Sequence, residues 1–166
     1  GLPMPGKWNR ARYVADSAFW QQLVAGSGKE IEFPLKGKSR KVQDVDGDHR
    51  PDAWSVVRDR EAFRALRQGK TPRRVLGVPR VFETLQASRT HLNGESKDSS
   101  PYVTPLTESV PTLAEMTEGA LNVLDNNRKG FFLMVEGGAT DWAAHSNRKG
   151  RLIEEMSDFY AAVEAV

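Results

Sequence analysis

Residues 131–135, Phe-Phe-Leu-Met-Val, form an apolar run without polar interruption. Such a run is typical of a β-strand that is covered on both faces, as in an α/β sheet. Glu136 follows at the carboxyl end of the predicted strand, where open α/β sheets bind their ligands. Gly137 and Gly138 then permit a tight turn and a close approach of the backbone. The pattern therefore predicts a buried strand that delivers a carboxylate to a site.

Helical periodicity flanks the predicted strand on both sides. Thr112, with Glu115 three residues later, predicts a capping box at a helix start, and this helix is expected to pack on the strand. Its apolar positions are Leu113, Met116, Ala120, Leu121 and Leu124. A last helix is expected from about Gly150. Its predicted inward positions are Leu152, Ile153, Met156, Phe159, Tyr160 and Val163.

The upstream part of the chain is rich in predicted loops, and its elements are short. We expect a single partial domain over residues 1–166, with a loop-rich part over 1–110 and a helix–strand–helix part over 111–166. The helix predicted over residues 60–68 has Phe63 and Leu66 inward and Gly69 at its end. The other predicted elements are helices at 14–25 and 81–85 and strands at 29–35 and 74–78.

Composition narrows the class of protein. A chain of 166 residues with 39% hydrophobic residues can bury a core, and no apolar run approaches the ~20 residues of a membrane helix. The 24 Lys and Arg are balanced by 22 Asp and Glu, so no nucleic-acid footprint is evident. The absence of cysteine excludes disulfides and thiolate metal sites.

The arginines at 58, 60, 64 and 67 alternate with acidic and apolar residues, a pattern typical of a solvated helix face.

Asp141 and His145 are four residues apart, so on a helix both side chains project from one face. A carboxylate oxygen and an imidazole nitrogen together suit zinc, while the nearby Glu136 suits a harder ion such as magnesium. The same spacing also occurs on solvated helix faces without a metal. The residues alone leave both interpretations open.

An acidic loop over residues 44–52 is the second candidate site. Its aspartates stand at loop positions one, three, five and nine, and Arg50 at position seven would contribute its backbone carbonyl. Oxygen ligands at alternating positions suit calcium, because the chain must wrap around the ion. The aspartates are Asp44, Asp46, Asp48 and Asp52. A full EF-hand would have Glu at position twelve, where this chain has Ser55, and an acidic turn without metal is the alternative.

Two segments resemble the alkaline phosphatases of the bacterial type. They are Pro-Thr-Leu-Ala-Glu-Met-Thr-Glu-Gly-Ala-Leu-Asn-Val-Leu at residues 111–124 and Lys-Gly-Phe-Phe-Leu-Met-Val-Glu-Gly-Gly-Ala-Thr-Asp-Trp-Ala-Ala-His at 129–145. The resemblance continues to Val166 and is looser at residues 19–23 and 71–78. It implies part of a three-layer α/β/α sandwich, with the acidic loop in a loop-rich insertion.

The resemblance also implies roles for the candidate ligands. Glu136 would bind magnesium, and Asp141 and His145 would bind one of two catalytic zinc ions. The parent protein would hydrolyse small-molecule phosphate monoesters with a serine nucleophile outside this chain. The resemblance further implies a periplasmic or secreted homodimer.

Other family motifs are missing: the first Asp, the nucleophilic Ser, the phosphate-binding Arg, and the later Asp-His pair and final His. We therefore expect an internal fragment that is inactive alone. Ser17, between Asp16 and Ala18, echoes the nucleophile motif, but the bulky Phe19 and Trp20 that follow would crowd a phosphate. We interpret Ser17 as structural. His91, in a polar loop, is interpreted as solvated.

Two alternatives remain open. The acidic loop could belong to a non-catalytic, calcium-stabilised interaction module. The strand-end carboxylate and the Asp–His pair would also suit another metal-dependent phosphotransferase or phosphodiesterase of the wider superfamily.

Overall fold

The computed structural model describes residues 54–81, 84–87, 89, 96 and 98–166. The chain divides into two compact units, one formed by Gly1–Val57 and Pro72–Val78, the other by Arg58–Thr71 and Pro79–Val166. The elements predicted over residues 14–25 and 29–35 lie outside the described residues.

A short parallel sheet belongs to the first unit. β1 (Ser55–Val57) pairs with β2 (Val75–Gly77), with Val56 opposite Leu76. The pair is closed by Ser55 N–H donating to Arg74 O at 2.9 Å and Val78 N–H donating to Val57 O at 2.9 Å. β2 lies within the strand predicted at 74–78. The parallel pairing is compatible with an α/β fold.

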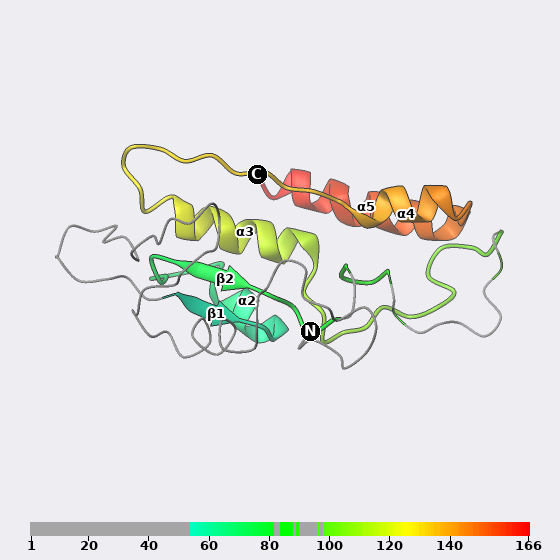
Figure 1. Ribbon diagram of the computed structural model, residues 1–166, viewed down its shortest axis with the longest axis horizontal. Coiled ribbons are helices and arrows are strands. Elements are labelled where there is room, and N and C mark those ends of the chain that lie inside the picture. The colour runs from blue at the N-terminus through cyan, green and yellow to red at the C-terminus, as the bar shows by residue number, and fades with distance from the viewer. Residues whose placement is uncertain (1–53, 82–83, 88, 90–95, 97) are drawn as a thin grey trace, which may run out of the picture. The chain divides into compact units, whose positions relative to one another are not determined.

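The described part of the second unit contains four helices: α2 (Arg60–Ala65), α3 (Leu113–Leu124), α4 (Ala139–His145) and α5 (Lys149–Glu164). α3 contacts both α2 and α5 and lies between them (Figure 1). Phe63 and Leu66 are buried, as predicted. Gly119 lets α2 and α3 approach closely, since a Cβ there would lie 3.1 Å from Leu66 Cβ.

Among residues 81–85, Thr84 and Leu85 lie in a turn rather than a helix.

The predicted capping box at the start of α3 is confirmed. Glu115 N–H donates to Thr112 Oγ1 at 3.1 Å, and Thr112 N–H donates to Glu115 Oε2 at 2.9 Å. These two bonds satisfy backbone donors that the helix itself leaves without partners.

The buried strand predicted at residues 131–135 does not form. This segment has no regular secondary structure, and Phe132 and Met134 are 88% and 73% exposed. A strand needs a neighbour that supplies backbone hydrogen bonds, and the sheet of the described residues contains only β1 and β2. The expected packing of α3 on this strand was therefore wrong as well. α3 packs against α5 and α2 instead.

The buried side of α5 also differs from the prediction. Ile153, Tyr160 and Val163 were predicted inward but are 43%, 59% and 56% exposed. The buried positions are Gly150, Arg151, Glu154 and Ala162. Two of these carry charges that are paired within the fold, so the helix buries a polar stripe. Apolar periodicity identified the helix, and the predicted inward positions Leu152, Met156 and Phe159 are half-buried, but the other three were misassigned.

Candidate metal site on α4

The two candidate zinc ligands lie together on α4. Asp141 occupies the first turn and His145 ends the helix, and Asp141 Oδ1 lies 3.4 Å from His145 Nε2. The carboxylate near the N-terminus matches the helix dipole. The predicted placement on one face is therefore confirmed. The two side chains are 71% and 81% exposed, so a metal ion can reach them.

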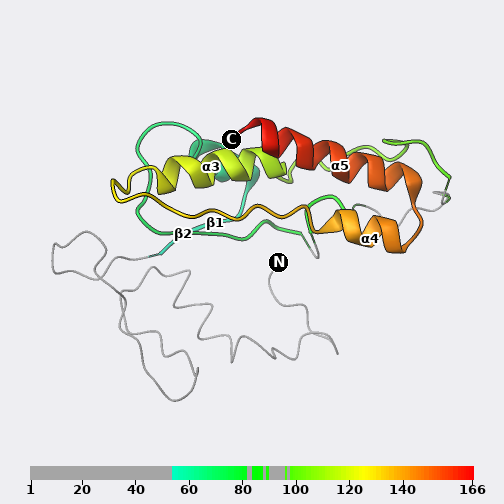
Figure 2. The same ribbon diagram turned by 90° about the horizontal axis from the view of Figure 1, so that it is seen from above.

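Packing of α4 explains why the pair faces outward. Ala139 and Ala143 are buried, and α4 packs against α5 and lies alongside its first half (Figure 2). Alanine side chains leave room for close helix contact. Asp141 and His145 therefore lie on the side of α4 that does not carry the buried alanines.

The distance within the pair fits a shared zinc ion. Two ligand atoms that each bind a tetrahedral zinc at about 2.0–2.1 Å lie about 3.3 Å from one another. Asp141 Oδ1 and His145 Nε2 are 3.4 Å apart without rearrangement. Two protein ligands are fewer than a zinc site requires, so the pair supplies part of a coordination sphere.

Glu136 is exposed and precedes α4 by a short turn. The turn is held on α5, because a Cβ at Gly137 would lie 3.1 Å from Phe159 Cδ2. Within the described part of the chain, no group of three or more His, Asp and Glu side chains is placed to hold a metal ion. The structure therefore brings Asp141 and His145 together and does not add Glu136 as their third ligand.

The remaining candidates lie outside the described residues. They are the acidic-loop residues Asp44, Asp46, Asp48, Arg50 and Asp52, together with Ser17 and His91. Their roles stay predictions from the sequence.

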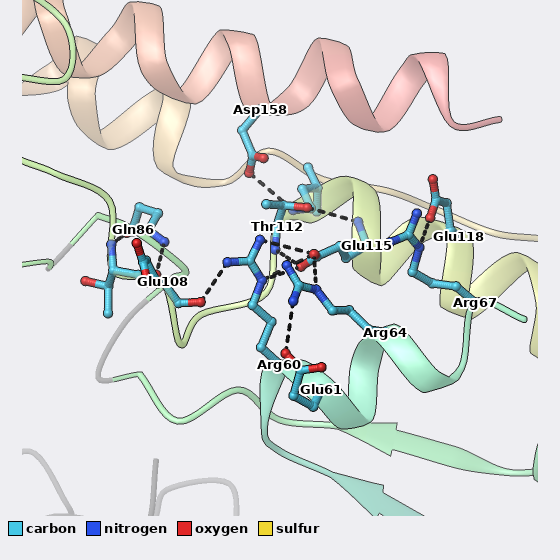
Figure 3. A network of polar contacts seen from close by, with 12 residues as sticks. Arg60, Glu61, Arg64, Arg67, Gln86, Glu108, Thr112, Glu115, Glu118 and Asp158 are labelled. Carbon is cyan, nitrogen blue, oxygen red and sulfur yellow. Dashed lines mark hydrogen bonds and ion pairs between the residues drawn. The ribbon is translucent and has the colours of Figure 1, made fainter.

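A charged network between α2 and α3 was missed by the sequence analysis (Figure 3). Arg60 Nε and Arg64 Nε donate to the Glu115 carboxylate at 2.9 and 2.7 Å. Arg60 Nη1 also donates to Glu108 O at 2.7 Å, and Arg67 pairs with Glu118. The arginine pattern on α2 was interpreted as a solvated face, and that was wrong for Arg60, whose side chain is 21% exposed.

Electrostatics of this network keep Glu115 ionised. Burial alone would raise the pKa of Glu115, but hydrogen bonds from Arg60, Arg64 and the Thr112 backbone outweigh it and lower that pKa to about 2. The capping box gave a local signal for Glu115. The partners on α2 are more than fifty residues away in the sequence, and no local pattern identifies them.

The structure therefore combines a parallel strand pair with a carboxylate and an imidazole at zinc-compatible spacing on one helix. The family model for alkaline phosphatase matches residues 21–166, and the chain belongs to this family. It is 49% identical to alkaline phosphatase 4 of Bacillus subtilis over 55 residues, which are 33% of this chain and 12% of the relative. It is 46% identical to the alkaline phosphatase of Escherichia coli over 57 residues, 34% of this chain and 12% of the relative.

A eukaryotic relative shows similar identity. The membrane-bound alkaline phosphatase of Bombyx mori is 46% identical over 54 residues, which are 32% of this chain and 10% of the relative. The matched stretches therefore span only about a tenth of the length of these relatives. No helix among the described residues has the length and apolar character needed to cross a membrane.

Proposed function

We propose that this chain is part of a phosphomonoesterase that uses two zinc ions, one magnesium ion and a serine nucleophile located outside the chain. The observation that carries this proposal is the Asp141–His145 pair, 3.4 Å apart on α4 in a segment that matches the alkaline phosphatase family. The matched relatives are named alkaline phosphatases. Small-molecule phosphate monoesters are the proposed substrates.

Each ligand has a defined task in this proposal. Asp141 supplies a negative oxygen and His145 a neutral imidazole nitrogen to one zinc, and the short helix presents both on its exposed face. Glu136, before α4, supplies a carboxylate oxygen to magnesium. When bound, paired zinc ions polarise the phosphoryl oxygens and stabilise the attacking and departing oxygens.

The exposed apolar side chains support a larger sandwich in the parent protein. Phe132, Met134, Tyr160 and Val163 are all more than half exposed. Large apolar side chains are usually covered, so several exposed ones in one domain point to a partner surface. We propose that further strands and helices of the parent cover these side chains in a three-layer α/β/α arrangement. The parent is proposed to be a periplasmic or secreted homodimer.

The test uses the full-length protein that contains this chain. Asp141→Asn and His145→Gln are each expected to lower zinc content and to reduce aryl phosphate hydrolysis by at least about 100-fold, because outer-shell substitutions alone cost 10–100-fold. Glu136→Gln is expected to reduce magnesium content instead. Asp125→Asn, an exposed carboxylate after α3, is the matched control.

Two results would contradict the proposal. One is a wild-type protein that binds zinc but hydrolyses no phosphate monoester. The other is unchanged zinc content and activity in both the Asp141→Asn and the His145→Gln variant. The 166-residue chain alone is expected to bind zinc weakly and to show no turnover, because it supplies two of the ligands that zinc needs.

A further inference from the structure

A buried charged cluster lies on the inner side of α5 and includes neither Asp141 nor His145. Glu154 Oε2 accepts a hydrogen bond from Arg89 Nη2, and the two side chains are 3% and 1% exposed. Glu154 Oε1 accepts from Tyr102 N–H, and Arg151 Nη1 lies 3.5 Å from Glu154 Oε2. A buried carboxylate is costly unless it is paired and hydrogen-bonded. These partners therefore tie α5 firmly to the chain segment that precedes α3.

Arg89 extends the connection along that segment. Its Nε and Nη2 atoms donate to Thr104 O at 3.3 and 3.1 Å. Arg89 and Thr104 are both buried. One guanidinium group thus binds the Thr104 carbonyl and the Glu154 carboxylate on α5 at the same time. Its planar, forked donors suit two such acceptors.

Gly150 provides a second contact one helical turn earlier on α5. A Cβ at Gly150 would lie 2.8 Å from Ser100 O, so the backbone at Ser99 and Ser100 passes directly over the first turn of the helix. Gly150 and Glu154 are four residues apart and share one edge of α5. Residues 99–104 therefore contact α5 at two successive turns, once through backbone packing and once through the buried charges.

The start of α5 in turn determines where α4 lies. A short turn over residues 146–148 joins the helices, with Arg148 N–H donating to Ala143 O at 3.0 Å and Asn147 N–H donating to Ala144 O at 2.9 Å. Asn147 has φ +52°, a conformation that asparagine tolerates better than most residues. α4 then packs against α5 along its buried alanines. A shift in the first turns of α5 would move Asp141 and His145 with it.

We propose that Arg89 and Glu154 are positioning residues for Asp141 and His145. This inference rests on the proposed function, in which Asp141 and His145 bind zinc. Arg89 and Glu154 lie in the interior and act through the backbone of α5 and α4. A metal site needs its ligand atoms within a few tenths of an ångström of the required positions. The buried ion pair supplies this restraint by holding α5 against residues 99–104.

The experiment measures zinc affinity of the full-length protein by competition with a chelator, at a temperature where circular dichroism shows each variant folded. Glu154→Gln retains the size of the side chain and one acceptor oxygen but removes the charge. It is expected to weaken zinc binding by about 10-fold, the lower end of the effect of losing a group bonded directly to a metal ligand, because Glu154 acts on the ligands through the backbone. A role in stability alone would lower the Tm and leave the zinc affinity of the folded protein unchanged.

Arg89→Lys is the second variant, chosen because it retains the positive charge and removes the forked geometry that reaches both Glu154 and Thr104. A smaller but measurable loss of zinc affinity is expected. Glu164→Gln, at the exposed end of α5, is the matched control and should bind zinc as the wild type does. At least one of the two variants, Glu154→Gln or Arg89→Lys, must fold for the comparison. If the folded variant binds zinc within about twofold of the wild-type affinity, the proposal is overturned.

His145→Gln in the same assay separates this proposal from the proposed function. If His145→Gln retains wild-type zinc affinity, the zinc role of the pair fails. If His145→Gln loses zinc while Glu154→Gln and Arg89→Lys bind it normally, the positioning role alone fails.

Discussion

Arg60 on α2 and Glu115 on α3 are 55 residues apart in the sequence, yet Arg60 Nε donates to Glu115 Oε2 at 2.9 Å (Figure 3). Arg64 binds the other oxygen of the same carboxylate. Glu115 also completes the capping box of α3 through the Thr112 backbone. One side chain therefore both starts a helix and fixes a second helix against it.

The first prediction concerns acid stability. Glu115→Gln should lower the free energy of unfolding at pH 7 by about 1–3 kcal/mol, since it weakens hydrogen bonds made by a charged group. The pKa of Glu115 is lowered in the folded protein from an ordinary 4.5 to about 2. Its contribution is therefore complete above pH 4.5 and lost as the pH falls toward 2. Urea unfolding at pH 7 and pH 3 should show a smaller difference between wild type and variant at pH 3.

Glu61→Gln provides the control for this prediction. Glu61 also pairs with Arg64, but its side chain is 82% exposed. Exposed pairs contribute at most about 1 kcal/mol. Equal destabilisation by Glu61→Gln and Glu115→Gln at pH 7 would contradict the central role of Glu115.

The second prediction concerns the cap of α3. Thr112→Ala removes the hydroxyl that accepts from Glu115 N–H and should lower the free energy of unfolding by about 1 kcal/mol. Ser109→Ala, in the exposed turn just before, should change it by less than about 0.5 kcal/mol. Chemical denaturation of both variants measures the difference. A Thr112→Ala protein as stable as Ser109→Ala would show that the cap contributes nothing.

The third prediction concerns a carboxyl on α5 that favours its protonated form. Burial, together with the negative charges of Asp158 and Glu154, raises the pKa of Glu155 to about 7 against the opposing effect of Arg89 and Arg151. The folded protein thus holds a proton that the unfolded chain releases from pH 4.5 upward. Stability should fall as the pH rises from about 4.5 to 7 and stay reduced above that range.

The side chain in Glu155→Gln is uncharged, like a protonated Glu155. The substitution should therefore abolish the fall in stability between pH 4.5 and 7. Its Tm should exceed that of the wild type by a few degrees at pH 8, since about 1 kcal/mol corresponds to about 2–4 °C in a domain of this size. The two proteins should differ little at pH 4. The same substitution at the exposed Glu164 should change neither value. A higher Tm for the wild type at pH 8 would contradict the direction of the pKa shift.

The fourth prediction tests the acidic loop. Calcium should raise the Tm of the full-length protein, by an amount that corresponds to about 2.7 kcal/mol at a calcium concentration 100 times the Kd. Asp46→Asn combined with Asp48→Asn should reduce this effect, because two charged oxygen ligands are lost. Magnesium at equal concentration is the control. A Tm that calcium does not change would favour the alternative of an acidic turn without metal.

Local sequence signals identified several elements of this protein. The capping box at Thr112 and Glu115 placed the start of α3 correctly, and apolar spacing identified α2 and α5. The spacing of Asp141 and His145 predicted their common helix face. These features succeed because helix periodicity and capping depend on residues within one or two turns.

Contacts between residues far apart in the sequence could not be predicted from local patterns. The strand predicted at residues 131–135 lacks a hydrogen-bonding neighbour in the described fold, although its composition suits a strand. Arg89 and Glu154 are 65 residues apart, and nothing local marks them as partners. A side chain's partner depends on which segments fold against it.

The sequence by itself determined where α2, α3 and α5 form and that Asp141 and His145 share a face, because these follow from short-range backbone geometry. The tertiary structure alone decided that α5 buries Arg151 and Glu154 while Tyr160 and Val163 stay exposed. The physical reason is that a charge can be buried when a distant residue neutralises it, and an apolar residue is buried only where another segment covers it.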